Sequence, residues 1–102
     1  MEFIETKIFT KQITKLLPDE EYKRLQSTLI LSPEAGDLIR NGGGLRKIRW
    51  KLAGTGKSGG IRAIYYYLSK KQHIFFVIAY AKSRQDNISD KELATLRKII
   101  ED

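Results

Sequence analysis

The feature that most constrains the fold is a pair of alternating segments around a glycine-rich loop. Apolar and cationic side chains alternate from Leu45 to Leu52, which is the pattern of a strand with one buried face. A second run of strand-forming residues spans Ile61–Leu68, and the loop Ala53–Gly60 between the two runs holds four glycines. Consecutive strands joined by a short loop pair antiparallel. The segment therefore predicts a hairpin with one apolar face and one cationic face.

The middle of the chain carries positive charge that no acid offsets. Between Leu38 and Gln85 there is no Asp or Glu, whereas eleven of the nineteen Lys and Arg residues lie there. They are Arg40, Arg46, Lys47, Arg49, Lys51, Lys57, Arg62, Lys70, Lys71, Lys82 and Arg84. A surface of a single sign attracts polyanions, and nucleic acid is the first candidate.

The N-terminal third predicts a strand and two helices. Phe3–Phe9 is rich in Phe, Ile and Thr and is typical of a strand, and Thr10 is a residue type that caps a following helix. Pro18 fits the first turn of a second helix, which Pro33 ends. Residues 34–41 are expected to form a connection with room for one helical turn.

The C-terminal third predicts a central strand and a capped helix. His73–Ala81 is apolar on both faces, which favours a middle position in the sheet. Ser89 and Glu92 have the spacing of a capping box before a helix that buries Leu93 and Leu96. The order strand, helix, helix, three strands, helix predicts one α+β domain over residues 1–102. We expect a small, mostly antiparallel sheet with the helices packed on one face.

Composition narrows the possible chemistry. The chain has no cysteine, which excludes disulfides, thiolate catalysis and zinc–cysteine sites. No apolar run approaches the ~20 residues of a membrane span, and the acidic N-terminus does not resemble a secretory signal. We therefore expect a cytoplasmic protein.

The central segment resembles a known family. The run PEAGDLIRNGGGLRKIRWKLAGTGKSGGIRAIYYY, the element order, and YAKSRQDNIS before the last helix are similar to the RelE superfamily of bacterial toxins, in its HigB-type and RelE-like branch. The resemblance implies a toxin of a type II toxin–antitoxin pair. It implies a RelE-like fold and cleavage of mRNA in the ribosomal A site without a metal or other cofactor, which inhibits translation. The expected partners are a cognate antitoxin, the ribosome with its rRNA, and mRNA.

The same resemblance implies a set of catalytic residues. Lys47 matches the first catalytic lysine, and Arg49 stands two residues on, where the best-known pattern has lysine. Arg62 matches the arginine at the head of the following strand, and Lys82 matches the basic cluster after the last strand. Ser83 replaces an arginine of the pattern, and the family's tyrosine has no clear counterpart.

The chemistry of the residue types supports a division of roles. Cleavage by the 2′-hydroxyl needs a proton acceptor, a donor for the leaving oxygen, and cations around the phosphorane. Guanidinium groups suit the last role, so Arg49 and Arg62 are the candidate phosphate stabilisers. Lys47, Lys57 and Lys82 are the candidates for proton transfer. Residue types alone favour phosphate positioning without catalysis, because charged sheet faces commonly bind without reacting.

Further residues are candidates for RNA binding, and other functions stay open. The candidates are cations and aromatics near the hairpin: Arg46, Lys51, Lys57, Tyr66, Tyr80 and Arg84. GTGKS lacks the first glycine of a phosphate-binding P-loop and leads into a strand rather than a helix. The alternatives are a ParE-like inhibitor of DNA gyrase with the same fold and an RNA-binding module without catalysis.

Overall fold

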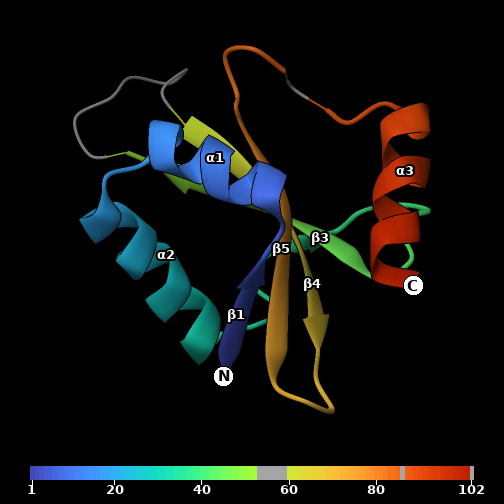
Figure 1. Cartoon of the computed structure of the whole chain (residues 1–102), viewed down its shortest axis with the longest axis horizontal. Helices are drawn as coiled ribbons and strands as arrows, with labels where there is room; N and C mark the ends of the chain where they lie inside the picture. The colour runs from blue at the N-terminus through green and yellow to red at the C-terminus, as the bar shows by residue number, and fades with distance from the viewer. Residues whose placement is uncertain (53–59, 86, 102) are drawn as a thin grey trace.

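A computed structural model describes residues 1–52, 60–85 and 87–101 (Figure 1). These described residues form three helices and a five-stranded sheet. The elements are β1 (Glu2–Glu5), α1 (Lys7–Leu16), α2 (Asp19–Leu31), β2 (Asp37–Leu38), β3 (Leu45–Lys51), β4 (Gly60–Leu68), β5 (His73–Ala81) and α3 (Asp90–Glu101). Within the described ranges, no helix is both long and apolar enough to cross a bilayer.

The sheet has the strand order β1-β5-β4-β3-β2. Neighbouring pairs from β2 to β5 are antiparallel, whereas β1 pairs with β5 in parallel. The expectation of an α+β fold with a mostly antiparallel sheet is confirmed. β5 lies between β1 and β4 rather than at an edge of the sheet, which is the position expected of His73–Ala81.

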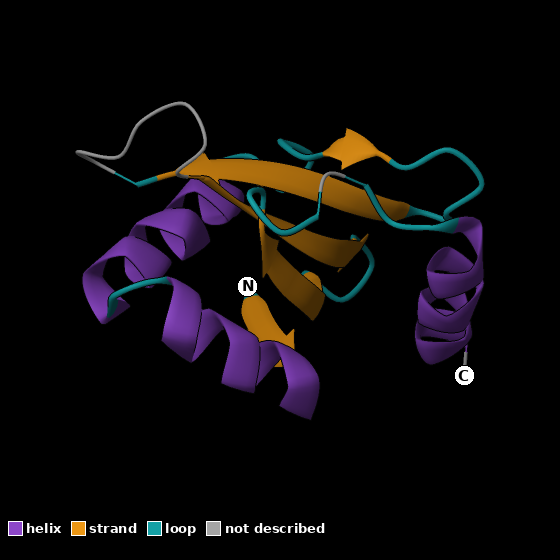
Figure 2. Ribbon diagram, turned by 90° about the horizontal axis from the view of Figure 1, so that it is seen from above, coloured by secondary structure: helices purple, strands orange, loops and turns teal. Residues whose placement is uncertain are grey.

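Helices cover both faces of the sheet, so the prediction that they pack on one face is wrong (Figures 1 and 2). α1 and α2 build the larger core, with Phe9 and Leu25 packed against Phe76 and its neighbours on one face. α3 builds a second core, with Leu93 and Leu96 packed against the opposite face. The physical reason is that β5 is apolar on both faces, so a single layer of helices would leave one face in water.

The start of α1 also differs from the expectation. The strand ends at Glu5 rather than Phe9, and Thr6 is the N-cap: its hydroxyl accepts the N–H of Phe9 at 3.0 Å. Thr10 lies one turn inside the helix, where its hydroxyl donates to Glu5 Oε1 at 2.6 Å. Pro18 is the N-cap of α2 rather than a residue of its first turn.

Residues 34–41 contain a two-residue strand, β2, instead of a helical turn. Its position is fixed by Tyr65, whose hydroxyl donates to the carbonyl oxygen of Pro33 at 2.7 Å and accepts the N–H of Gly36 at 2.9 Å. A Cβ at Gly36 would lie 2.7 Å from the Tyr65 ring, so only glycine allows this approach. The anchor places Asp37 opposite Lys47 at the edge of the sheet.

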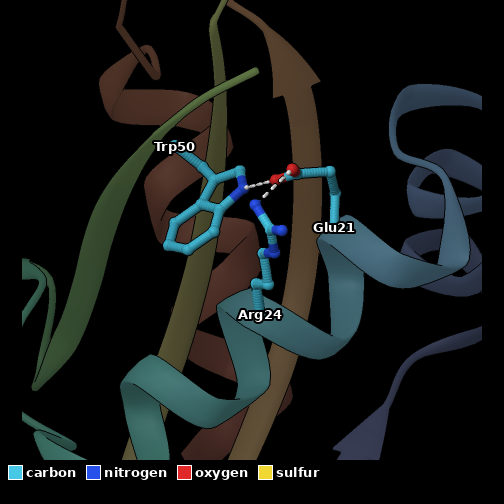
Figure 3. A network of polar contacts seen from close by, with 3 residues as sticks. All are labelled: Glu21, Arg24 and Trp50. Atoms are coloured by element: carbon cyan, nitrogen blue, oxygen red, sulfur yellow. Dashed lines mark hydrogen bonds and ion pairs between the residues drawn. The ribbon is translucent and has the colours of Figure 1, made fainter. Parts of the chain in front are cut away.

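A polar network connects α2 to the C-terminal end of β3 (Figure 3). The indole N–H of Trp50 donates to Glu21 Oε2 at 3.0 Å, and Arg24 Nη1 lies 3.4 Å from Glu21 Oε1. Trp50 packs against the larger core, as expected of an anchor. The contact holds the end of β3 against α2, so the opposite face of β3 stays available for its cations.

Candidate functional site

A cationic cleft lies on the face of β3 and β4 opposite to α1 and α2. Its volume is about 460 Å³. Five cations and one amide line it: Lys47, Arg49, Lys51, Arg62, Lys82 and Asn87. None of the described lining residues is a carboxylate, and each of them offers a hydrogen-bond donor to an anion.

Strand geometry places these cations on one face. The residues of β3 at positions 47, 49 and 51 alternate with the core residues Ile48 and Trp50, as the period of two predicts. Arg49 and Arg62 are direct partners across the β3–β4 pair. The backbone N–H of Lys82 donates to the carbonyl oxygen of Gly60 at 3.0 Å, which holds the end of β5 beside the start of β4.

Few side-chain bonds restrain the cleft. Lys47 Nζ donates to Asn87 Oδ1 at 3.3 Å, and Arg62 Nη1 donates to the carbonyl oxygen of Ile61 at 3.2 Å. Within residues 1–52, 60–85 and 87–101, none of the five lining cations has a carboxylate within 4.0 Å. Charged donors without an acidic partner are what a phosphate-binding surface needs.

The sequence matches one family model over its whole length. That family is described as the RelE toxin of the RelE/RelB toxin–antitoxin system, and the match spans residues 1–102. The chain belongs to the RelE toxin family.

Solved structures of E. coli RelE share the fold of this RelE-family toxin. A double arginine-to-alanine mutant of RelE in the free state is 20% identical with a TM-score of 0.60, over 97% of this chain and 95% of that one. The isolated toxin in its P21 crystal form is 21% identical with a TM-score of 0.58, over 96% and 97%. A chain of the intact RelBE toxin–antitoxin complex is 24% identical with a TM-score of 0.57, over 78% and 94%.

The cleft brings together five of the ten residues that sequence reasoning selected. The four expected catalytic residues and Lys51 line it. Arg84 is exposed in the turn after β5 and is not among the lining residues. Lys57 lies outside the described residues. The sequence analysis did not select Asn87, because an asparagine in a polar loop is an ordinary turn residue.

Three of the residues proposed for RNA binding lie elsewhere in this RelE-family toxin. Arg46 is on the opposite face, where Nη1 donates to the carbonyl oxygen of Gly36 at 2.8 Å. Tyr80 is 8% exposed in the core beneath α3, so its ring cannot stack on a base. Tyr66 packs against the same core and lines a separate apolar cleft beside the end of α3. Tyr66 and Tyr80 differ from the expectation because α3 covers the part of the opposite sheet face that we expected to be open, whereas Arg46 lies on the other face.

Proposed function

We propose that this RelE-family toxin is a ribosome-dependent mRNA endoribonuclease that inhibits translation. The supporting observation is the cleft itself, where five cations from β3, β4 and the turn after β5 converge and no acid is among the described lining residues. Amines, guanidinium groups and one amide are donors for phosphate oxygens rather than ligands for a hard divalent cation. The donor set therefore favours metal-free cleavage.

The proposed reaction uses the 2′-hydroxyl of the substrate as nucleophile. This oxygen loses its proton and bonds to the adjacent phosphorus, the bond to the 5′-oxygen breaks, and that oxygen takes up a proton. The products are a 2′,3′-cyclic phosphate and a 5′-hydroxyl. The phosphorane between them carries more negative charge than the substrate, so Arg49 and Arg62 stabilise it preferentially. Lys47 and Lys82 are the described candidates for the two proton transfers.

We propose that the ribosome compensates for the acid–base groups missing among the described cleft residues by orienting the substrate. The lining residues that the structure describes include no histidine or carboxylate, which are the common acid–base groups at neutral pH. A substrate held in one geometry by the ribosome gains the benefit of orientation that a small open cleft does not give. We therefore propose that free RNA is a poor substrate and that mRNA in the A site is a good one.

A cognate antitoxin is the proposed protein partner. The E. coli relative was solved in an intact RelBE complex, and the basic cleft here favours an antitoxin with an acidic segment over Arg62. Covering this cleft would exclude RNA by charge and by volume.

Single-turnover cleavage on programmed ribosomes tests the function. The purified toxin is incubated with mRNA alone and with the same mRNA in a ribosomal complex, and the ends of the fragments are mapped. Lys71→Ala removes one charge in the exposed turn after β4 and is the matched control for cleft variants. Cleavage only on ribosomes supports the proposal. Inhibition of gyrase, or RNA binding without cleavage in either arm, would instead support one of the alternative functions.

A further inference from the structure

We propose that Asn87 is the positioning residue that makes Lys47, rather than Lys82, the proton acceptor of the reaction. This inference rests on the proposed function and adds a residue to its site. The observation that supports it is the 3.3 Å hydrogen bond from Lys47 Nζ to Asn87 Oδ1, which joins positions 40 residues apart in the sequence. Both residues line the cationic cleft.

Lys47 differs from the other cations of the cleft. In the part of the chain that the structure describes, the side chain of Lys47 forms a hydrogen bond with the side chain of another cleft residue, Asn87. The described bond of Arg62 is to the neighbouring backbone, at Ile61. A lysine amine sits on a flexible four-carbon stem, so a base at its end needs a partner that fixes its direction. The amide oxygen of Asn87 holds one N–H and leaves the rest of the amine directed to the substrate.

The backbone around Asn87 is itself held by α3. Gln85 Nε2 donates to the carbonyl oxygen of Asn87 at 3.2 Å and to Glu92 Oε1 at 3.3 Å. The same carboxylate oxygen accepts the N–H of Ser89 at 3.2 Å in the capping box of α3. A series of hydrogen bonds therefore connects Lys47, through Asn87 and Gln85, to Glu92 in the first turn of α3. An asparagine in a freely moving loop would not have this support.

Among the described residues, the charges around Lys47 come from four parts of the fold. Asp37 lies opposite on β2, Arg49 and Lys51 follow on β3, Arg62 lies on β4, and Lys82 follows β5. Asn87 adds a dipole and no charge. Replacing the amide by a carboxylate changes the local charge by one with little change of shape, so it separates an acid–base role of Lys47 from a purely structural one.

The test is the pH dependence of single-turnover cleavage on programmed ribosomes, for wild type, Asn87→Asp, Asn87→Ala and a control. In Asn87→Asp the new carboxylate favours the ammonium form of its neighbour. The rising limb of the pH–rate profile is therefore expected to move to higher pH by about one unit. Asn87→Ala is expected to lower the plateau rate about tenfold, with little change in ribosome affinity. The matched control is Asn41→Asp, which adds the same charge on the loop before β3, beside Arg97.

The outcomes separate this inference from the proposed function. A wild type that cleaves, a shifted limb in Asn87→Asp and an unshifted limb in Asn41→Asp support the inference. A wild type that cleaves while both Asp variants keep the wild-type profile overturns it and leaves the endoribonuclease intact. A wild type that does not cleave on ribosomes overturns the proposed function and this inference with it. Thermal unfolding of each variant shows whether a loss of rate is a loss of fold.

Discussion

Arg49 and Arg62 lie directly opposite each other on β3 and β4, and both side chains line the cationic cleft. Like charges in this position destabilise a sheet by roughly 0.2–1 kcal/mol relative to a neutral pair. None of the described acidic residues lies within 4.0 Å of either guanidinium group. The fold therefore holds two guanidinium groups close together, and a bound anion can offset the resulting loss of stability. This arrangement is expected of a phosphate site.

Removing one member of this pair should separate catalysis from stability. In Arg62→Ala the loss of a preorganised donor should lower the single-turnover cleavage rate about a hundredfold, or roughly 3 kcal/mol. Ribosome affinity should fall by only about 1 kcal/mol. Stability should stay the same or rise slightly, because the opposed charge is relieved. Cleavage, ribosome binding and thermal unfolding are measured on the same preparation.

The control for Arg62→Ala is Lys71→Ala, which removes an exposed charge in the turn between β4 and β5. Lys71 is not among the lining residues of the cleft. It should change rate and stability little. Near-normal cleavage by Arg62→Ala at saturating ribosome would exclude Arg62 from the catalytic set. A large fall in its melting temperature would show that the side chain supports the fold instead.

Tyr65 should be the tyrosine whose hydroxyl matters most for stability. Its hydroxyl group donates a hydrogen bond to the carbonyl oxygen of Pro33 and accepts one from the buried N–H of Gly36. Tyr65→Phe leaves that N–H without its partner, which should lower the free energy of unfolding by about 1–3 kcal/mol. Tyr67→Phe is the matched control, because the described hydrogen bond of the Tyr67 hydroxyl is an exposed one, from Gln72. Urea unfolding followed by Trp50 fluorescence measures both, and equal losses would contradict the prediction.

Alkaline pH should destabilise the protein through Tyr22. Burial raises the pKa of Tyr22 above its ordinary value of 10.0, and the bond of its hydroxyl to Glu5 Oε2 at 2.6 Å raises this pKa further. The unfolded chain binds fewer protons than the folded one above pH 10, so stability is full below that pH and falls as pH rises. Unfolding by urea between pH 9 and 11 should therefore become easier. Tyr22→Phe should show a shallower decline, and an unchanged slope would remove Tyr22 as the cause.

Local patterns predicted the elements whose signal lies within a few residues. The third strand of the expected set, His73–Ala81, has the bounds of β5, and the period of two placed the cations of β3 on one face. The capping box at Ser89 and Glu92 is formed. Each of these signals depends on neighbours in sequence, so no knowledge of tertiary contacts was needed.

Sequence reasoning misplaced the starts of α1 and α2 by a few residues, whereas three larger features that it missed depend on distant contacts. β2 is two residues long and exists because Tyr65 holds the preceding backbone. Tyr80 is buried because α3 returns over the face opposite to α1 and α2. The bond of Asn87 to Lys47 spans 40 positions, and neither residue carries a local pattern that indicates the other. The site could be predicted as a set of cations, but not as a cleft with its partners.

The capping box should connect stability at the start of α3 with the cleft. Ser89 Oγ accepts the N–H of Glu92 at 3.1 Å, and the N–H of Ser89 donates to Glu92 Oε1 at 3.2 Å. Backbone and side-chain bonds from Ser89 hold the pKa of Glu92 below its ordinary value of 4.5. The contribution of this carboxylate is therefore present above that value and is lost as pH falls through the lowered pKa.

Ser89→Ala should lower the free energy of unfolding by about 1 kcal/mol at pH 7. The difference from wild type should shrink at pH 3, where the carboxylate is being protonated. Cleavage should also slow, because the same carboxylate holds Gln85 and, through it, the backbone of Asn87. Ser27→Ala is the control, since Ser27 is exposed within α2. Urea unfolding at both pH values and single-turnover cleavage at pH 7 measure the effects. Full stability with slowed cleavage would show that the serine acts on the site directly and not through the helix.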